Sequence, residues 1–312
     1  MFIYSDNNKR YHTLDYFYKN KFNSKVFKIS LDAGFTCPNI DGRVGTKGCI
    51  YCSKKGSGDF AGNKNESLTM QFEKIKNMML KKWPNGKYIG YFQAHTNTYA
   101  SVDVLKEKYE EILKIDNVIG LNIATRADAI DSECLQYLNE LNKKTFLTIE
   151  LGLQTIHDKT SNLINRCHSL KTFTDMVNLL RKNNINVVVH IINGLPYETK
   201  EMMIETVKYI NNLDIQGVKI HMLHILKNTE LEKLYSNEKF HILTKEEYVD
   251  IVATQLLYLR PEIVIHRITG DPDKNELIEP IWLLKKFCVL NDIDKKMKEL
   301  DIYQGEKAIS LN

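Results

Sequence analysis

The segments INVVVHIINGL (185–195), KEMMIETVKYINNL (200–213) and GVKIHMLHIL (217–226) follow one another almost without interruption. The first and third are near-continuous apolar runs rich in Val and Ile, which is typical of strands buried on both faces. The middle segment carries its apolar residues at helical spacing. Two buried strands joined by a helix favour neighbouring parallel strands.

The same alternation of strand and helix continues on the N-terminal side of this unit. Six strand–helix units are expected, with apolar strands at 26–31, 87–92, 118–125, 145–153, 185–195 and 217–226. The helix from 131 has Asp131 as its expected N-cap. No nucleotide-type Gly-rich turn follows the first strand, so an incomplete TIM-like (β/α)6 barrel is favoured over an open doubly wound sheet. We expect an α/β barrel over 1–243 with an N-terminal arm, and a helical extension packed on it over 244–312.

Composition limits the class of protein. The chain has 312 residues, of which 43% are hydrophobic, and this is enough for a large core. No run of about eighteen apolar residues predicts a membrane helix, and the charged N-terminus lacks a signal-peptide pattern. A cytoplasmic protein is therefore expected. The net charge of +4 excludes an obvious polybasic nucleic-acid binder.

A cysteine-rich loop follows the first expected strand. The sequence SLDAGFT (30–36) leads into CPNIDGRVGTKGCIYC (37–52), which holds half of the six cysteines. In a reducing compartment such a cluster indicates metal binding or catalysis more than disulfides. A structural zinc site needs four ligands, and a redox pair needs only two thiols. Three thiolates could instead hold a four-iron cluster with one iron open. Cys134 and Cys288 are expected to be small buried residues of apolar helix faces.

Motifs along nearly the whole chain, taken together, resemble the radical S-adenosylmethionine (SAM) enzymes of the YtqA/YhcC type. This type is related to the radical SAM module of the Elongator catalytic subunit. The motifs are RYHTLDYF (10–17), VFKISLDAGFTCPN (26–39), GCIYCS (48–53), YFQAHTNTYA (91–100), ATRAD (124–128), ELGLQT (150–155), INRCHS (164–169), HIINGLP (190–196), GVKIHMLHILKNTELEKLY (217–235), IHRITGD (265–271) and EPIWLLKKFCVLN (279–291).

The resemblance implies a radical SAM barrel and its two cofactors. Cys37, Cys49 and Cys52 would ligate a [4Fe-4S] cluster whose open iron chelates SAM. One electron would then cleave SAM and release a 5′-deoxyadenosyl radical. Cofactor contacts are implied for eight polar residues near strand ends: Gln93, Thr96, Asn97, Arg126, Glu150, Gln154, Arg166 and Asn193.

These eight residues have different implied roles. Gln93, Thr96 and Asn97 stand where related enzymes usually have a Gly-Gly-Glu stretch that meets the SAM amino group. Arg166 matches an arginine that reads the SAM carboxylate, where a guanidinium can bind bidentately. A buried acid such as Glu150 needs a partner, which favours a ligand or hydrogen-bonding role.

Three basic residues near the C-terminal side of the barrel are the expected catalytic residues: Lys219, His224 and His266. Lys219, His221 and His224 are expected to project together from the sixth strand into the lumen. His190 is either a satisfied core histidine or a further lumen residue.

The implied substrate is tRNA, through its single-stranded anticodon loop. The reaction would convert a carboxymethylaminomethyl group on wobble 2-thiouridine to aminomethyl, with a flavodoxin or ferredoxin as electron donor. Residues 1–30 carry six Lys or Arg against two Asp, with Tyr11, Tyr16, Phe17 and Tyr18 among them. This arm either meets phosphates or packs its aromatic residues under the barrel. The alternative class is a zinc-stabilised RNA-binding protein without catalysis.

Overall fold

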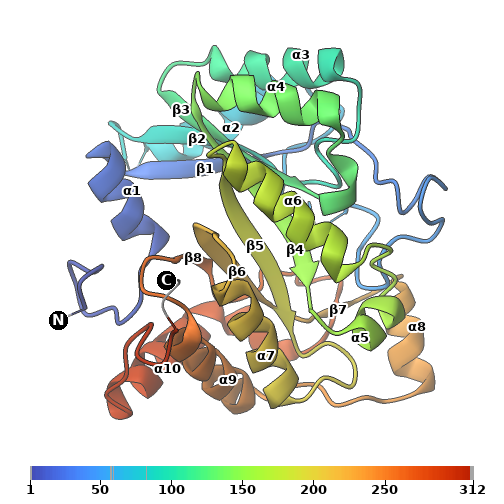
Figure 1. Ribbon diagram of the computed structural model, residues 1–312, viewed down its shortest axis with the longest axis vertical. Helices are drawn as coiled ribbons and strands as arrows, with labels where there is room; N and C mark the ends of the chain where they lie inside the picture. The colour runs from blue at the N-terminus through green and yellow to red at the C-terminus, as the bar shows by residue number, and fades with distance from the viewer. Residues whose placement is uncertain (1, 57, 59, 82, 310–312) are drawn as a thin grey trace.

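The computed structural model describes residues 2–56, 58, 60–81 and 83–309. Within this part, seven strands form one parallel sheet that curves into a half-barrel (Figure 1). The strand order β1-β2-β3-β4-β5-β6-β8 follows the chain, so each strand pairs with the strand of this sheet that comes next in the sequence. The strands are β1 Val26–Leu31, β2 Lys87–Phe92, β3 Val118–Thr125, β4 Phe146–Gln154, β5 Asn186–Asn193, β6 Gly217–Met222, β7 Ile225–Leu226, β8 Val264–Arg267 and β9 Leu277–Glu279.

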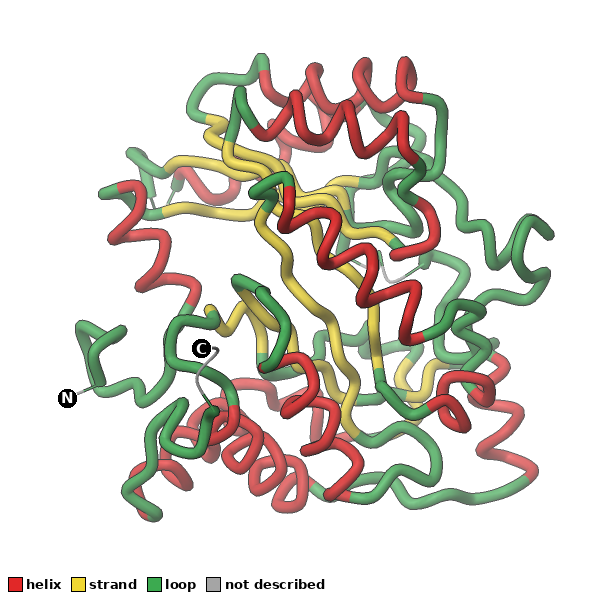
Figure 2. Tube along the Cα trace, viewed as in Figure 1, coloured by secondary structure: helices red, strands yellow, loops and turns green. Residues whose placement is uncertain are grey.

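Helices connect the strands and cover the outside of the sheet (Figure 2). The helices are α1 Leu14–Phe22, α2 Leu68–Leu80, α3 Val102–Leu113, α4 Ser132–Asn142, α5 Asp158–Leu163, α6 Leu170–Lys182, α7 Lys200–Asn211, α8 Glu230–Asn237, α9 Lys245–Tyr258 and α10 Lys286–Glu299, with 3-10 turns η1 Ala127–Ala129 and η2 Ile281–Lys285. Asp131 caps α4 as predicted, since its carboxylate accepts from the Cys134 backbone N–H at 2.9 Å. No helix in the described residues is long and apolar enough to span a bilayer.

The predicted α/β half-barrel with C-terminal helices is confirmed, with one strand more than the pattern indicated. The seventh strand, β8, belongs to the region expected to be a helical extension, and it pairs in parallel with β6. It has four residues, which is too short for a clear apolar period. Residues after β6 also form the two-stranded antiparallel sheet β7-β9. The C-terminal region therefore completes the sheet as well as covering it.

Helix α1 lies across the N-terminal ends of the strands. Tyr18 is 4% exposed and packs with Val26 and Ile89, near the starts of β1 and β2. Phe17 and Phe22 are half-buried against the same cluster. In Figure 1, α1 lies at the left and the blue loop that follows β1 extends at the right. Of the two roles left open for the arm, the structure shows aromatic packing under the barrel.

Gln304 joins the two ends of the described chain beside α1. Its side-chain oxygen accepts from the His12 backbone N–H at 2.8 Å, and its amide donates to the carbonyls of Arg260 and Ile263. The Gln304 backbone N–H also donates to the Arg10 carbonyl at 2.9 Å. Because Gln304 is 3% exposed, these bonds are shielded from water and hold the N-terminal segment against β8.

Candidate active site

A cavity of about 440 Å³ lies inside the half-barrel, extending from the cysteine loop at one end to Leu14 of α1 at the other. Parallel strands place their C-terminal ends on one rim, and the loops there meet over the lumen. Most of the residues predicted from the sequence line this cavity: Cys37, Cys49, Cys52, Gln93, Thr96, Arg126, Glu150, Gln154, Arg166, Lys219, His224 and His266.

The three clustered cysteines share the cavity wall, whereas the other three lie elsewhere. The six cysteines all lie in the described residues, and they form no disulfide bonds. Cys134 is buried in α4, as expected of a small core residue. Cys288 is exposed at the start of α10, so the expectation that it is buried is wrong; its turn of helix faces solvent. Cys167 is also exposed and does not line the cavity.

The INRCHS segment holds the cysteine loop in place. The Asn39 amide donates to the Asn165 carbonyl at 2.6 Å, and the Asn165 amide donates back to the Gly48 carbonyl at 2.7 Å. The Ile50 backbone N–H donates to the Ile164 carbonyl at 3.1 Å. These three bonds join the loop after β1 to the turn after α5, so the thiols have a fixed support.

Cys49 has the environment of a metal-ligating thiol. A hydrogen bond from Cys52 lowers the pKa of Cys49, and the charge of Arg126 and hydrogen bonds from Tyr51 and Asn39 lower it further, to about 6 against the opposing effect of burial. The Asn39 amide nitrogen lies 3.7 Å from the Cys49 Sγ. Since the thiolate is the form that binds metals, this cysteine is prepared for ligation.

The arrangement of the thiols differs from that of a single-ion site. In the described part of the chain, no three His, Cys, Asp or Glu side chains gather closely enough to hold one metal ion. Cys37, Cys49 and Cys52 line the same cavity, and Cys52 hydrogen-bonds to Cys49. Thiolates of an iron–sulfur cluster bind different irons and so stand further apart than ligands of one ion. The donor set and its placement fit a cluster.

Arg166 is bonded to backbone carbonyls. Its guanidinium is 1% exposed and donates to the carbonyls of Leu153 and Thr155, both at 2.6 Å, and to that of His168 at 3.0 and 3.1 Å. These four bonds leave no two parallel N–H groups for a carboxylate. Arg166 clamps the end of β4 to the turn before α6, so it supports the cysteine loop indirectly.

Arg126 is the arginine whose charge faces the cysteines. It donates from Nε and Nη2 to the two carboxylate oxygens of Asp128, each at 2.8 Å. Burial lowers the pKa of Arg126, but the hydrogen bonds and charge of Asp128 outweigh it and raise this pKa. The guanidinium is therefore a fixed positive charge beside Cys49 and Cys37.

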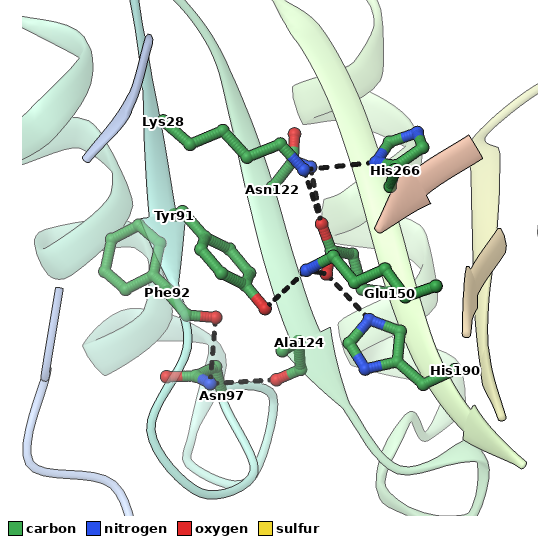
Figure 3. A network of polar contacts seen from close by, with 10 residues as sticks. Lys28, Tyr91, Phe92, Asn97, Asn122, Ala124, Glu150, His190 and His266 are labelled. Carbon is green, nitrogen blue, oxygen red and sulfur yellow. Dashed lines mark hydrogen bonds and ion pairs between the residues drawn. The ribbon is translucent and has the colours of Figure 1, made fainter. Parts of the chain in front are cut away.

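Glu150 is the centre of a buried polar network in the lumen (Figure 3). Its Oε1 accepts from Lys28 Nζ at 3.0 Å and from the Asn122 amide at 2.6 Å. Its Oε2 accepts from His190 Nε2 at 2.8 Å and from Lys219. Four strands thus contribute partners to one carboxylate, which is completely buried.

The network continues through both lysines. Lys219 Nζ also donates to the Tyr91 hydroxyl at 2.9 Å, and Lys28 Nζ lies 3.1 Å from His266 Nδ1. His266 therefore contacts the network from β8, the strand that the pattern did not indicate (Figure 3). His190 is a lumen residue rather than a core histidine, since it lines the cavity.

Burial and neighbouring charges shift the pKa values of this network. Burial raises the pKa of Glu150, but the charges of Lys219 and Lys28 outweigh it and hold this pKa well below its ordinary value. Burial lowers the pKa of Lys219 to about 7, against the attraction of Glu150. Burial and the charge of Lys219 lower the pKa of His190 to about 4. The carboxylate is thus ionised and His190 neutral near neutral pH.

Two predicted cofactor residues, Asn97 and Asn193, do not line the cavity. The Asn97 amide donates to the carbonyls of Phe92 at 3.2 Å and Ala124 at 2.8 Å, so it fixes the loop after β2. Asn193 exchanges two 2.8 Å hydrogen bonds with Gln255 of α9. Both side chains are turned into the protein because buried backbone and amide groups need partners.

Four further predicted residues reach the cavity from loops and strand ends. Gln93 and Thr96 follow β2. The Gln93 backbone N–H donates to the carbonyl of Leu31 at the end of β1, and that of Thr96 donates to the carbonyl of Thr36, both at 3.2 Å. Gln154 ends β4 with a positive φ of 64°. His224 lies beyond Met222, the last residue of β6, so it reaches the cavity from a loop and not by strand alternation.

Sequence reasoning missed several cavity residues, and for some of them a signal was present. Lys28 is the charged residue of an apolar strand, the same signal that drew attention to Glu150. Tyr91 lines the cavity, and Asn122 donates to Glu150 without lining it; both lie on neighbouring strands, within apolar runs that are typical of buried strands. His95 also lines the cavity, and its φ of 62° was not visible in the sequence.

Comparison with known proteins identifies the family. The sequence profile of the Radical SAM superfamily matches residues 40–210, and that of the Radical_SAM C-terminal domain matches residues 215–299. The chain therefore belongs to the radical SAM superfamily. It is 50% identical over 305 residues to YtqA from Bacillus subtilis (strain 168), covering 98% of this chain and 95% of that protein. It is 30% identical over 280 residues to YhcC from Escherichia coli (strain K12), covering 89% of each.

Similarity also extends to Elongator proteins. The chain is 27% identical over 157 residues to Elongator complex protein 3 from Schizosaccharomyces pombe, covering 49% of this chain and 28% of that protein. The structure of the archaeal Methanocaldococcus infernus Elp3 matches with a TM-score of 0.67 at 18% identity. It covers 90% of this chain, which spans 64% of the length of that one. At this identity the match shows the shared half-barrel fold.

Proposed function

We propose that this protein holds a [4Fe-4S] cluster on Cys37, Cys49 and Cys52, cleaves SAM and acts on a modified wobble uridine of tRNA. One observation carries the first part of the proposal. The three thiols of the loop after β1 share one cavity wall, and the pKa of Cys49 is lowered to about 6, chiefly by a hydrogen bond from Cys52. Membership of the radical SAM superfamily supports the same cofactors.

When bound, the cluster would supply the electron that cleaves SAM and yields a 5′-deoxyadenosyl radical. The residues of the chain position and shield this chemistry. Asn39 and Tyr51 orient Cys49, and Arg126 places a positive charge beside it. Helix α1 closes the far end of the lumen, so water is limited where the substrate lies.

SAM contacts are proposed for the predicted residues that line the cavity near the cysteines. Gln93 and Thr96 after β2, and Gln154 at the end of β4, offer amide and hydroxyl groups to the amino and ribose groups of SAM. The charge of Arg126 acts on Cys49, and its guanidinium donates two N–H groups to Asp128. Arg166 contributes by holding the support of the loop.

The tRNA substrate is inferred from the resemblance to the Elongator radical SAM module and from the similarity to Elongator complex protein 3. The reaction proposed is conversion of the carboxymethylaminomethyl group on wobble 2-thiouridine to aminomethyl. Hydrogen abstraction from the methylene beside the carboxylate, transfer of one further electron from that carbon to an oxidised electron carrier, and addition of water would cleave the C–N bond and release the two carbons as glyoxylate. An anticodon loop is single-stranded, so this base can be turned out into a cavity. A flavodoxin or ferredoxin is the proposed electron donor.

Iron loading tests the cofactor assignment. After anaerobic reconstitution, the wild-type protein is expected to be brown with a shoulder near roughly 400 nm, as thiolate-bound clusters are. Cys49→Ala should lose the cluster, because two remaining thiolates are too few to retain it, whereas Cys134→Ala should keep full iron. Unchanged iron in Cys49→Ala, or a colourless protein that takes up zinc, would favour the zinc-stabilised RNA-binding alternative.

Nucleoside mass spectrometry tests the substrate. The reconstituted enzyme, a reductant, SAM and tRNA carrying carboxymethylaminomethyl-2-thiouridine should yield the aminomethyl nucleoside together with 5′-deoxyadenosine. Cys49→Ala is the matched inactive control. Formation of 5′-deoxyadenosine without any change in the nucleoside would leave the SAM chemistry standing and remove tRNA as the substrate.

A further inference from the structure

The inner end of the cavity carries more positive than negative charge. Lys28 and Lys219 face one acid, Glu150, and the side chains of these three residues are 14%, 8% and 0% exposed. Arg267 adds a further cation at the cavity wall, and its contact with Asp271 is 3.9 Å long. Asp271 also accepts from Lys286 at 2.7 Å, so its charge is shared. Unbalanced charge in a buried site is costly without a ligand.

Hydrogen-bond donors are also left over at this end. Among the residues that the structure describes, Lys28 donates to Glu150 and contacts His266, and Lys219 donates to Glu150 and Tyr91. Each ammonium has three N–H groups, so one on each lysine remains for a ligand. Within the same described residues, the buried Nε2 of His221 has no hydrogen-bond partner. His221 lies on β6, as Lys219 does, and it lines the same cavity.

We propose that the inner end of the cavity is a binding site for the carboxylate of the substrate, held by Lys28 and Lys219. A monoanion balances the single excess charge of these two lysines and Glu150. Burial, together with the charges of Lys28 and Arg267, lowers the pKa of Lys219, and a bound anion would oppose this by favouring the protonated lysine.

This inference rests on the proposed function and makes it more specific. The carboxymethylamino group ends in a carboxylate, with the methylene to be attacked directly beside it. One cavity runs from Lys28 and Lys219 to the three cysteines. A carboxylate anchored at the inner end would therefore leave the adjacent methylene on the side that faces the cysteines. The lysines would then select substrates that carry the acid and would reject the aminomethyl product.

A pair of small ligands tests the site without turnover. N-benzylglycine carries the same secondary amine and carboxylate, and N-benzylglycinamide is its neutral match. Calorimetry with the reconstituted, SAM-bound enzyme should show the acid binding about tenfold or more tightly than the amide, the scale of a charged hydrogen bond. Lys28→Met and Lys219→Met should abolish this preference. Lys245→Met, which removes an ion pair with Asp292 outside the cavity, should retain it.

The outcomes separate this inference from the proposed function. Equal or absent binding of the two ligands by the wild-type enzyme would overturn the carboxylate site, even if the tRNA is modified. A preference for the acid that survives in both lysine variants would overturn it as well. A clear preference in an enzyme that leaves tRNA unchanged would support the site and remove the tRNA substrate. The wild-type comparison decides even if a lysine variant fails to fold.

Discussion

At the scale of single residues, Arg166 shows how a buried cation can be satisfied without an acid. Carbonyl oxygens of Leu153, Thr155 and His168 accept its hydrogen bonds, and each is a strong partner for a charged donor. Burial lowers the pKa of Arg166, although a guanidinium stays protonated under ordinary conditions. The charge is therefore used to join backbone segments that carry the cysteine loop.

Replacing this arginine is expected to affect stability first. Arg166→Met should lower the free energy of unfolding by about 3 kcal/mol or more, because it leaves several buried carbonyls without donors. Urea unfolding of the iron-free protein measures this, with Arg43→Met on the exposed part of the cysteine loop as control. If Arg166→Met is as stable as the control and only SAM affinity falls, Arg166 reads the SAM carboxylate after all.

The role of a residue could be predicted from the sequence only where its partner was near in sequence or where burial implied that it needed one. Glu150 was identified because an acid in an apolar strand needs partners, and the same reasoning applies to Lys28. Asn193 carried the same signal, but its partner Gln255 is on a helix formed much later in the chain. A polar residue in a strand therefore indicates burial with a partner, and only the folded structure shows which partner.

At the scale of elements, helix α1 is the part of the chain that closes the half-barrel from below. Tyr18 is the centre of its contact with β1 and β2, and Thr13 at its start forms a bridge to Ile265 of β8. Lys19 and Lys25 both pair with Asp15, so part of the basic charge of this arm is neutralised within the arm. Helix α1 therefore covers the end of the half-barrel that is opposite the cysteines.

Two substitutions at Tyr18 distinguish the contribution of its ring to stability from that of its hydroxyl. Tyr18→Ala should cost about 3–5 kcal/mol of unfolding free energy, the usual range for deleting a buried aromatic ring. Within the described residues the hydroxyl of Tyr18 is buried without a hydrogen-bond partner, so Tyr18→Phe should leave stability unchanged or raise it. Thermal and urea unfolding check both variants. A large loss in Tyr18→Phe would show that the hydroxyl has a partner and is needed.

The element pattern predicted the half-barrel because parallel strands buried on both faces are apolar throughout and alternate with helices. The segment 185–226 shows this well, and β5, α7 and β6 form there as expected. Strand β8 was missed because four residues give no period, and its pairing with β6 spans two intervening helices, α8 and α9. Short edge strands depend on tertiary contacts that a local pattern does not contain.

At the scale of the whole molecule, strands from β1 to β8 bring ionisable groups to one buried network. Two lysines, one glutamate and several histidines share it, and burial sets which of them are charged. Because these groups are far apart in the sequence, the unfolded chain exposes each of them separately to water. Folding stability must therefore depend on pH through this network.

His190 gives that dependence a direction. Its pKa falls from 6.5 to about 4 on folding, so between these values the unfolded chain binds a proton that the folded chain does not. Stability from this residue is complete above pH 6.5 and is lost as the pH falls. From pH 7.5 to pH 5 the wild type should lose about 2 kcal/mol more than His190→Gln, whose amide can still donate to Glu150.

Urea unfolding of the iron-free protein at several pH values measures this difference. The exposed histidine His241, which contacts Glu247, provides the control, and His241→Gln should follow the wild-type pH dependence. If His190→Gln and the wild type lose stability in parallel, His190 is protonated as easily in the folded protein as in the unfolded chain. The charge assignment of the network would then need revision.

The hydrogen bonds of Gln304 have a consequence for where other molecules can be attached to this protein. Gln304 ties the segment around His12 to the turn before β8, and Figure 1 shows both chain ends on the side of α1. A tag, surface tether or fused domain attached on the side of α1 would lie away from the cysteines and from the rim at the C-terminal ends of the strands. Pulling the segment around His12 away from β8 would load the buried hydrogen bonds of Gln304.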